Sequence, residues 1–528
     1  MKIEIKLGDV VLDPANRIDL KSLAEEKALD LIRSAFGFLA AGTEFAIQSG
    51  ILSITIQEHG AEEQDKVQKL VHSALELAQA GKHTQAIALF LQALEIIPSH
   101  TETRRNLAMA YLKSGNTEAA KNQLIDVLRL SPKDAQAFTL LGNIYARDTN
   151  PPDLAAAERC YDNAVILVPG DATNWSNLAT VKLQREEFAT AAPLYRKAIE
   201  FDPQLAYARF GLAQALATPG DTQGGLQVLE DLFDAKLLDT AQNQVIKGDC
   251  QELYLSLCSA IADSAAFDSM WRAVHVYRET VAGITGWQIE IKEDPAVENA
   301  MAATSYPEDA ATPNRYVVRY SPHGKPVLPY MVARELELLL LRFEAARQGE
   351  QASWILERAS PSVNRIITLH INQNAYSKSK KDALSQFVSR VVQTLMPQLP
   401  EFPLYALADM RLWTKLPAIR PSQFIGIYLF ATRRRHPLDS AEVSKGLPLA
   451  FRNAFETAAA AWALYVDRIT GGRSRWSQPY ALSPGMPLAR DIADAWHHSF
   501  ESAAATAPVT SELLDALKAS DWYSRHKG

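Results

Sequence analysis

The side chains best suited to chemistry in this sequence are its histidines and its three cysteines. Neighbouring residues on a helix point about 100° apart, so the adjacent His497 and His498 would not converge on one ion. No CxxC pair is present, and neither the glycine-rich phosphate loops nor a GxSxG elbow occurs. We therefore predict neither a metal nor a cofactor. The side chains considered were His323, His370, His436, His497, His498, Cys160, Cys250 and Cys258.

A strong helix is predicted from Leu328 to Gln348, and it carries the best single catalytic candidate, Glu335. The helix is apolar nearly all round over residues 336–341, so it should be buried. Two alternating stretches, at residues 287–292 and 315–321, precede it and read as strands.

This order resembles the core of the HExxH zinc metallopeptidases, in which two histidines bind zinc and the intervening glutamate acts as general base. Glu335 stands in place of that glutamate, but the two ligand positions hold Arg334 and Leu338, and neither residue can bind zinc. The resemblance implies a zincin-like fold without its metal, a pseudo-metallopeptidase. The alternative is a plain buried helix, in which Glu335 pairs with Arg334, Arg342 or Arg319.

A basic run at Arg433, Arg434 and Arg435 suggests a different partner. Together with Lys415, Arg420 and Trp413 it could form a patch for RNA or phosphate. The formal net charge of the chain is −7, and charge runs are usually solvated, so nucleic acid is not the partner we expect.

The elements that organise the chain are five repeats between residues 63 and 240. Pro98 and Pro132 lie 34 residues apart, as do Pro169 and Pro203, whereas Pro132 and Pro169 are 37 apart because of a surplus at residues 148–153. Small or large apolar residues recur twelve, eight and five positions before each proline: Ala86, Phe90, Ala93; Ala120, Leu124, Val127; Ala157, Tyr161, Ala164; Ala191, Tyr195, Ala198. A period of this length indicates two antiparallel helices per unit, with the proline ending the second.

The repeats resemble the tetratricopeptide repeat (TPR) family, and the fifth unit reads as a degenerate terminal one. This resemblance implies a curved solenoid that binds a peptide or partner protein in its concave face, which the first helix of each unit lines. Carried over position by position, the lining is Arg105, Asn106, Met109, Thr139, Asn143, Ser176, Asn177, Thr180, Tyr207 and Phe210.

The basic clamp with which some TPR proteins hold a C-terminal carboxylate is absent. Leu140, Tyr207 and Gly211 occupy its places. Asn143 and Asn177 stand where some relatives use asparagines to hold a peptide backbone. The alternative is that these two asparagines only bridge neighbouring helices.

The rest of the chain predicts a mainly α protein. Residues 1–62 read β-α-β-β, with a helix from Leu20 to Ala41, and should pack on the solenoid or on the C-terminal part. The alternative is that their sheet offers an edge for self-association. Residues 241–285 read as capping or linker helices, and residues 286–528 as an α+β domain in which residues 397–421 are irregular. The fold class is thus a TPR α-solenoid with a small N-terminal α/β domain and a C-terminal α+β domain.

Composition places limits on the class of protein. Apolar residues make up 47% and charged residues 22%, as in soluble globular chains, and no apolar stretch is long enough to span a membrane. Charges stand where a signal peptide would need an apolar core, and the cysteines are few and odd in number, so we expect a cytoplasmic protein, of bacterial composition.

Three functions remain open. The first is a protein–protein interaction scaffold with a non-catalytic C-terminal module. The second is a peptidase-like hydrolase that acts on a partner recruited by the repeats, for which Glu335 should meet His323 or His370 in a cleft. The third is an adaptor associated with nucleic acid.

Overall fold

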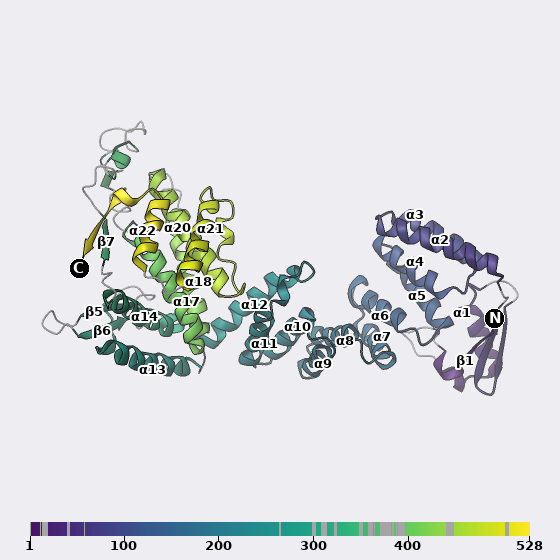
Figure 1. Ribbon diagram of the computed structural model, residues 1–528. Coiled ribbons are helices and arrows are strands. Elements are labelled where there is room, and N and C mark those ends of the chain that lie inside the picture. The colour runs from purple at the N-terminus through teal and green to yellow at the C-terminus, as the bar shows by residue number, and fades with distance from the viewer. Residues whose placement is uncertain are drawn as a thin grey trace. The chain divides into compact units, whose positions relative to one another are not determined.

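A computed structural model describes the fold, and its helices and strands are labelled in Figure 1. The described residues are 2–10, 12, 19–39, 43–56, 59–262, 264, 266–297, 303–307, 314–321, 325–347, 352–356, 363, 365–369, 382, 385–386, 388, 396–439, 448–501 and 506–527. The chain divides into two compact units, Met1–Gly220 and Asp221–Gly528, and each is described by itself.

Unit 1 begins with the predicted β-α-β-β module. It contains β1 (Lys2–Lys6), α1 (Glu25–Ala35), β2 (Glu44–Gln48) and β3 (Ile51–Thr55). The sheet has the order β1-β3-β2 with antiparallel pairs, so the hairpin strand β3 is central. The alternation seen in the sequence puts Leu52 and Ile54 in the core with no exposed surface.

The helix of this module is shorter than predicted. The side chain of Asp19 accepts a hydrogen bond from the backbone N–H of Lys21, which makes a separate 3-10 turn over Leu20–Ser22. Ala24 then adopts an extended conformation, and α1 starts only after it. Capping side chains compete with a continuous helix in this way, so the expected start at Leu20 was wrong.

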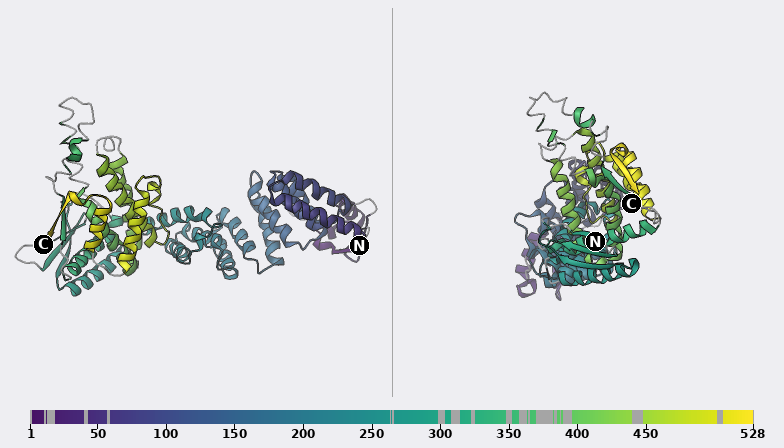
Figure 2. Two further views of the ribbon diagram at one scale, coloured as in Figure 1. Left: turned by 45° about the horizontal axis from the view of Figure 1, so that its top comes forward. Right: turned by 90° about the vertical axis from the view of Figure 1, so that its left-hand side faces the viewer.

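Helix pairs fill the rest of unit 1, and they can be followed in Figure 1 and from two further directions in Figure 2. The helices are α2 (Ala61–Gln79), α3 (His83–Ile96), α4 (Thr101–Lys113), α5 (Thr117–Leu130), α6 (Ala135–Asn143), α7 (Leu154–Leu167), α8 (Ala172–Gln184), α9 (Phe188–Phe201) and α10 (Ala206–Ala217). The surplus residues of the third unit fall after a π-helical turn at Ile144–Asp148, in the loop that leads to α7.

The recurrent residues before each proline form the core of these pairs. All twelve are at most 1% exposed. Close approach is needed where Gly142 of α6 faces the ring of Tyr161 in α7, because a Cβ at this glycine would lie 2.7 Å from the ring atom Cε1. The pattern read from the sequence therefore corresponds to packing between the two helices of a pair.

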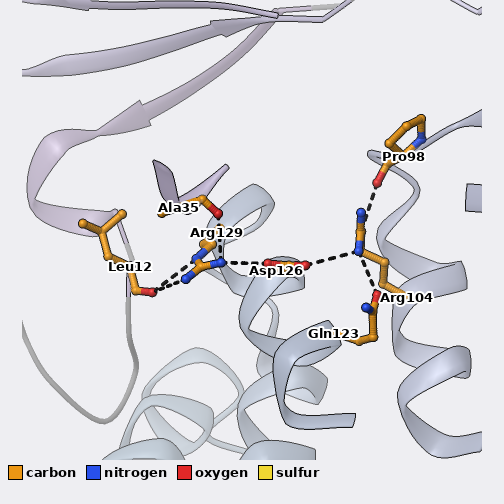
Figure 3. Close-up of polar contacts among 7 residues, drawn as sticks. All are labelled: Leu12, Ala35, Pro98, Arg104, Gln123, Asp126 and Arg129. Atoms are coloured by element: carbon orange, nitrogen blue, oxygen red, sulfur yellow. Dashed lines mark hydrogen bonds and ion pairs between the residues drawn. The ribbon is translucent and has the colours of Figure 1, made fainter. Parts of the chain in front are cut away.

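The N-terminal module packs on α5, as Figure 3 shows. The Arg129 side chain donates hydrogen bonds to the backbone carbonyls of Leu12 (3.0 Å) and Ala35 (2.8 Å). Asp126 bridges Arg129 and Arg104 at 2.8 and 3.3 Å. Leu130 belongs to the apolar core of the module. The β-α-β-β segment is thus held to the second helix pair by a buried charge network together with apolar packing.

Unit 2 combines helices with two small sheets. Its elements are α11 (Thr222–Asp234), α12 (Gln244–Ala262), α13 (Phe267–Thr285), β4 (Gln288–Glu293), β5 (Ala303–Pro307), β6 (Arg315–Tyr320), α14 (Leu328–Arg347), β7 (Ala352–Leu356), α17 (Phe402–Lys415), α18 (Arg420–Asp439), α20 (Leu449–Ile469), α21 (Met486–Glu501), α22 (Thr506–Ala516) and β8 (Tyr523–Lys527). One sheet has the order β4-β6-β5, and the other pairs β7 with β8.

Residues 397–421 are helical, so the prediction of an irregular segment there was wrong. Pro403 and Pro417 lie at the first positions of their helices, where a missing N–H costs nothing, whereas Pro400 lies inside the 3-10 helix Met396–Glu401. The strands at 288–293 and 315–320 and the helices α14 and α20 lie where the sequence predicted them.

Candidate functional site

The first helices of the repeats carry the predicted lining, and their N-terminal caps fix where each begins. Asp134 accepts a hydrogen bond from the N–H of Ala137 at 2.9 Å, and Asp171 accepts one from the N–H of Thr173 at 2.9 Å. The uncharged ring of His100 caps α4 in the same way, from the N–H of Thr103. These caps satisfy backbone donors that a helix start leaves open.

Four predicted lining residues use their polar groups inside the repeats. Arg105 forms an ion pair with Asp134, the cap of the next unit's first helix. Thr139 donates to Asn174 Oδ1 at 2.7 Å, which again joins two units. Asn143 Oδ1 accepts from the Tyr161 hydroxyl at 2.7 Å, and Thr180 lies 2.9 Å from the Tyr195 hydroxyl. These side chains position the helices.

Five other lining residues have exposed surface or side-chain polar groups without a partner in the described chain. Met109 and Tyr207 are 39% and 41% exposed, and Phe210 is half-buried. The half-buried side chains of Asn106 and Asn177 form no hydrogen bond with any part of the chain that the structure describes. Ser176 is buried and has little surface to offer. The two predicted asparagines therefore differ, because Asn143 bridges helices whereas Asn177 has its amide open.

A groove of about 900 Å³ lies on the first repeat. The lining that was predicted from the sequence did not include this groove. Its apolar lining comes from Val67, Val71 and Leu75 of α2 and from Ile97 of the α3–α4 turn. Its polar lining includes Gln68, His72, His100 and Glu102. It thus offers an apolar surface bordered by hydrogen-bonding groups, as ligand pockets often do.

The repeat register would have revealed this groove. Val71, His72 and Leu75 stand 34 residues before Arg105, Asn106 and Met109, so they occupy the same lining positions one unit earlier. The prediction missed these residues because the aligned prolines begin at Pro98. No aligned proline precedes the first helix of the first repeat, so its register was not assigned.

Burial at this groove favours the neutral form of one histidine. Burial lowers the pKa of His100, and the charge of Glu102 opposes that shift only in part. A neutral ring suits its role, because Nδ1 must be unprotonated to accept from the N–H of Thr103. The groove and the start of α4 therefore share a residue that responds to pH.

Glu335, the catalytic candidate, lies half-buried on α14, and the fully buried carboxylate is that of its neighbour Glu337. Glu337 accepts from the Tyr277 hydroxyl and pairs with Arg411 at 3.3 Å. Glu335 contributes to the electrostatic field that raises the pKa of Arg334. His323 and His370, with which a catalytic Glu335 was expected to meet, lie outside the described residues.

Arg334, which stands at the first zinc-ligand position of the motif, pairs with a buried acid. Its Nε lies 3.3 Å from Asp409 Oδ1, and both side chains are at most 5% exposed. Asp409 also accepts from the Tyr330 hydroxyl at 2.7 Å and from Trp462 Nε1 at 3.2 Å. Burial alone would lower the pKa of Arg334, but the charge of Asp409 raises it above its usual value. This centre ties α14 to α17 and α20.

The remaining predicted chemistry has no site in the described part of the chain. No group of three His, Cys, Asp or Glu side chains there could hold a metal ion. The cysteines are buried and free, and burial raises the pKa of Cys250 to about 12. Trp413 is only 6% exposed and packs under the Arg420 guanidinium, so it cannot stack on a base. The side chains of Arg433, Arg434 and Arg435 lie outside the described residues.

Comparison with known families agrees with the helix pairs. A family model described as "Tetratricopeptide repeat" matches residues 77–144, and a second model with the same description matches residues 152–206 and 176–235. No curated protein matches the sequence. No model supports the metallopeptidase resemblance, since both matches lie in the repeats. Over the described residues, no helix is long and apolar enough to cross a membrane.

Solved structures of repeat proteins are similar to about a third of this chain. One, described as "Crystal structure of MamA", is 21% identical and covers 31% of this chain and 94% of its own, with a TM-score of 0.29. YrrB, described as "a TPR protein with an unusual peptide-binding site", is 17% identical and covers 36% and 94%, with a TM-score of 0.30. A thermophilic TPR protein of Thermus thermophilus is 21% identical and covers 36% and 98%, with a TM-score of 0.29. The family models, together with the helix pairs, show that the chain carries tetratricopeptide repeats.

Proposed function

We propose that the protein is an interaction scaffold whose repeats bind an extended peptide segment of a partner protein. The observation that carries the proposal is the pair Asn106 and Asn177. They occupy one register position in two units, and within the described chain their amides have no partner. An asparagine amide both donates and accepts, so it matches the N–H and C=O of an extended backbone.

The groove on the first repeat would provide the second set of contacts with the peptide. Val71 and Leu75 line it at the register positions of Arg105 and Met109. An apolar side chain of the peptide would be desolvated there, and burial of one such side chain contributes about 1.5–3 kcal/mol. The backbone contacts would then set the direction of the peptide, and the groove would select one apolar residue.

In this proposal, unit 2 is a non-catalytic module. Arg334 and Glu337 are held in buried ion pairs by Asp409 and Arg411. Such pairs position helices and do not present an acid or base to a substrate. The finer assignment of that unit as a former metallopeptidase gains no support from this geometry.

Selection from a random 12-residue phage-displayed library on the full-length protein would supply a peptide for the test. Fluorescence anisotropy then compares the wild type with the Asn106→Ala, Asn177→Ala double variant. Each lost hydrogen bond should cost about 1 kcal/mol, so the Kd should rise at least tenfold. The matched control is Asn163→Ala, the same change on the second helix of a unit, where the amide donates to the carbonyl of Arg159.

A second variant separates the groove from the amides. Leu75→Asp places a charge in the apolar lining and should weaken the same peptide, whereas Leu91→Asp on the exposed side of α3 should not. Peptides that bind the double variant and Leu75→Asp as tightly as the wild type would contradict the proposal.

A further inference from the structure

A second cleft lies wholly within unit 2. Its volume is about 550 Å³, and it is formed by α12, α18 and the loop that follows α20. The loop residues that line it are 473–476 and 478–480. No residue of α14 is among its lining residues.

The loop is held in one conformation by a single carboxylate. Asp467 accepts from the Ser474 hydroxyl at 2.6 Å and from the N–H of Trp476 at 2.9 Å. Its second oxygen accepts from both the N–H (2.9 Å) and the hydroxyl (2.6 Å) of Ser477. Because the backbone is fixed before any ligand arrives, the lining side chains of the loop are pre-organised.

Aromatic rings form much of the wall. The rings of Phe424 and Trp476 lie 4.8 Å apart between centroids, and Tyr428 and Tyr480 are the other aromatic residues of the lining. Flat apolar walls of this kind favour a planar ring, which gains both burial and offset stacking.

A buried guanidinium gives the cleft its polar character. Arg473 is 2% exposed, and its terminal nitrogens donate to the Thr470 carbonyl at 2.9 Å and to Asp234 at 2.6 Å. Its Nε–H has no acceptor among the residues that the structure describes. A buried donor left without a partner is destabilising, and more so when it is charged, so an acceptor from outside the chain would be favoured.

The charged side chains of the lining are all paired. Arg475 pairs with Glu252 at 2.6 Å, and Arg473 pairs with Asp234, which is not a lining residue. The polar group of the lining that remains without a partner in the described chain is therefore the Nε–H of Arg473.

We propose that this cleft binds a small aromatic carboxylate, whose ring packs against Trp476 and the half-buried Tyr428 and whose carboxylate accepts from Arg473 Nε. Binding is non-covalent and independent of the peptide site in the repeats. Recognition combines a ring-shaped apolar surface with one charge-assisted hydrogen bond.

The test uses two probes with the same ring and opposite charge, indole-3-acetate and tryptamine, titrated into the full-length protein by calorimetry. Indole-3-acetate should bind at one site per chain and at least tenfold more tightly than tryptamine, because a hydrogen bond to a charged group contributes about 1.5–3 kcal/mol. Trp476→Leu should weaken indole-3-acetate at least tenfold, whereas Trp175→Leu in the repeats should leave it unchanged.

The wild-type comparison does not depend on any variant folding correctly. Equal binding of the two probes would overturn the proposal, since the guanidinium would then play no part. So would the absence of binding at about 10 mM probe, which would mean that water serves as the acceptor. Tight binding of indole-3-acetate that Trp476→Leu leaves unchanged would place the ligand elsewhere and would also contradict it.

Discussion

Two sets of polar side chains suggested function in the sequence, and the structure treats them differently. On α14, the catalytic candidate Glu335 has two buried charged neighbours, Arg334 and Glu337, whose charges are neutralised by Asp409 and Arg411. On the first helices of the repeats, the amides of Asn106 and Asn177 are half-buried and unbonded within the described chain.

This difference distinguishes polar groups that stabilise the fold from polar groups that can still bind a ligand. A buried charge must be paired to be tolerated, so its partners come from within the chain. A half-exposed amide is satisfied by water and can exchange that water for a ligand at little cost. The repeats themselves contain both kinds, because Asn143 is bonded to Tyr161 whereas Asn177 is not.

The largest effect should come from breaking the centre on α17. Asp409→Asn leaves the Arg334 guanidinium buried without its counter-charge, and we expect a loss of about 3–5 kcal/mol in the free energy of unfolding, measured by urea denaturation. Asp494→Asn removes the exposed pair with Arg468 and should cost less than about 1 kcal/mol. Similar losses in the two variants would contradict a structural role for the buried pair.

A smaller effect is expected within one repeat. Tyr161→Phe deletes the hydroxyl that donates to Asn143 and should reduce stability by about 1 kcal/mol. Tyr207→Phe removes an exposed hydroxyl and should change it by less than about 0.5 kcal/mol. If Tyr161→Phe is as neutral as Tyr207→Phe, Asn143 does not serve as a bridge between the helices.

The cap of α4 should give a pH signature. The folded-state pKa of His100 lies below the value of 6.5 expected for an unfolded chain. Between these two values the unfolded state binds more protons, so the stability from His100 is present above pH 6.5 and is lost as the pH falls through the folded pKa.

His100→Asn keeps a capping side chain that does not titrate. The stability difference between wild type and variant should therefore shift against the wild type by up to about 1 kcal/mol as the pH falls below 6.5, in urea denaturation across that range. A pH-independent difference would show that the ring of His100 does not act as a neutral cap.

The smallest effect on stability should come from the open amide. Asn177→Ala should change the free energy of unfolding by no more than about 0.5 kcal/mol. Asn174→Ala, three residues earlier on the same helix, removes a buried amide bonded to Thr139 and Asp171 and should cost about 1 kcal/mol or more. A large loss for Asn177→Ala would mean that this side chain is also structural.

The sequence was most informative where contacts are local. The spacing of Ala120, Leu124 and Val127 before Pro132 predicted a helix pair, and all three residues are buried in its core. The same repeat register places Val71 and Leu75, which line the groove on the first repeat, at predicted lining positions. The prediction missed them because the aligned prolines start only at Pro98.

Elsewhere the decisive partners lie far apart in the chain. Arg334 pairs with Asp409, and Arg129 binds the carbonyl of Leu12, and no spacing rule joins such residues. Which of two glutamates on α14 is fully buried also depends on the helices packed around it, so attention fell on Glu335 while Glu337 lies in the core. The cleft beside Trp476 combines α12, α18 and a loop, and it too was beyond prediction.

Hydrogen–deuterium exchange of the full-length protein, with and without a library-selected peptide, tests the proposed peptide site most directly. Bound peptide should slow exchange in α2, α4 and α8, where Leu75, Asn106 and Asn177 lie, and leave the second helices α3, α5 and α9 unchanged. Protection confined to the second helices, or to the unit that begins at Asp221, would contradict peptide binding along the first helices of the repeats.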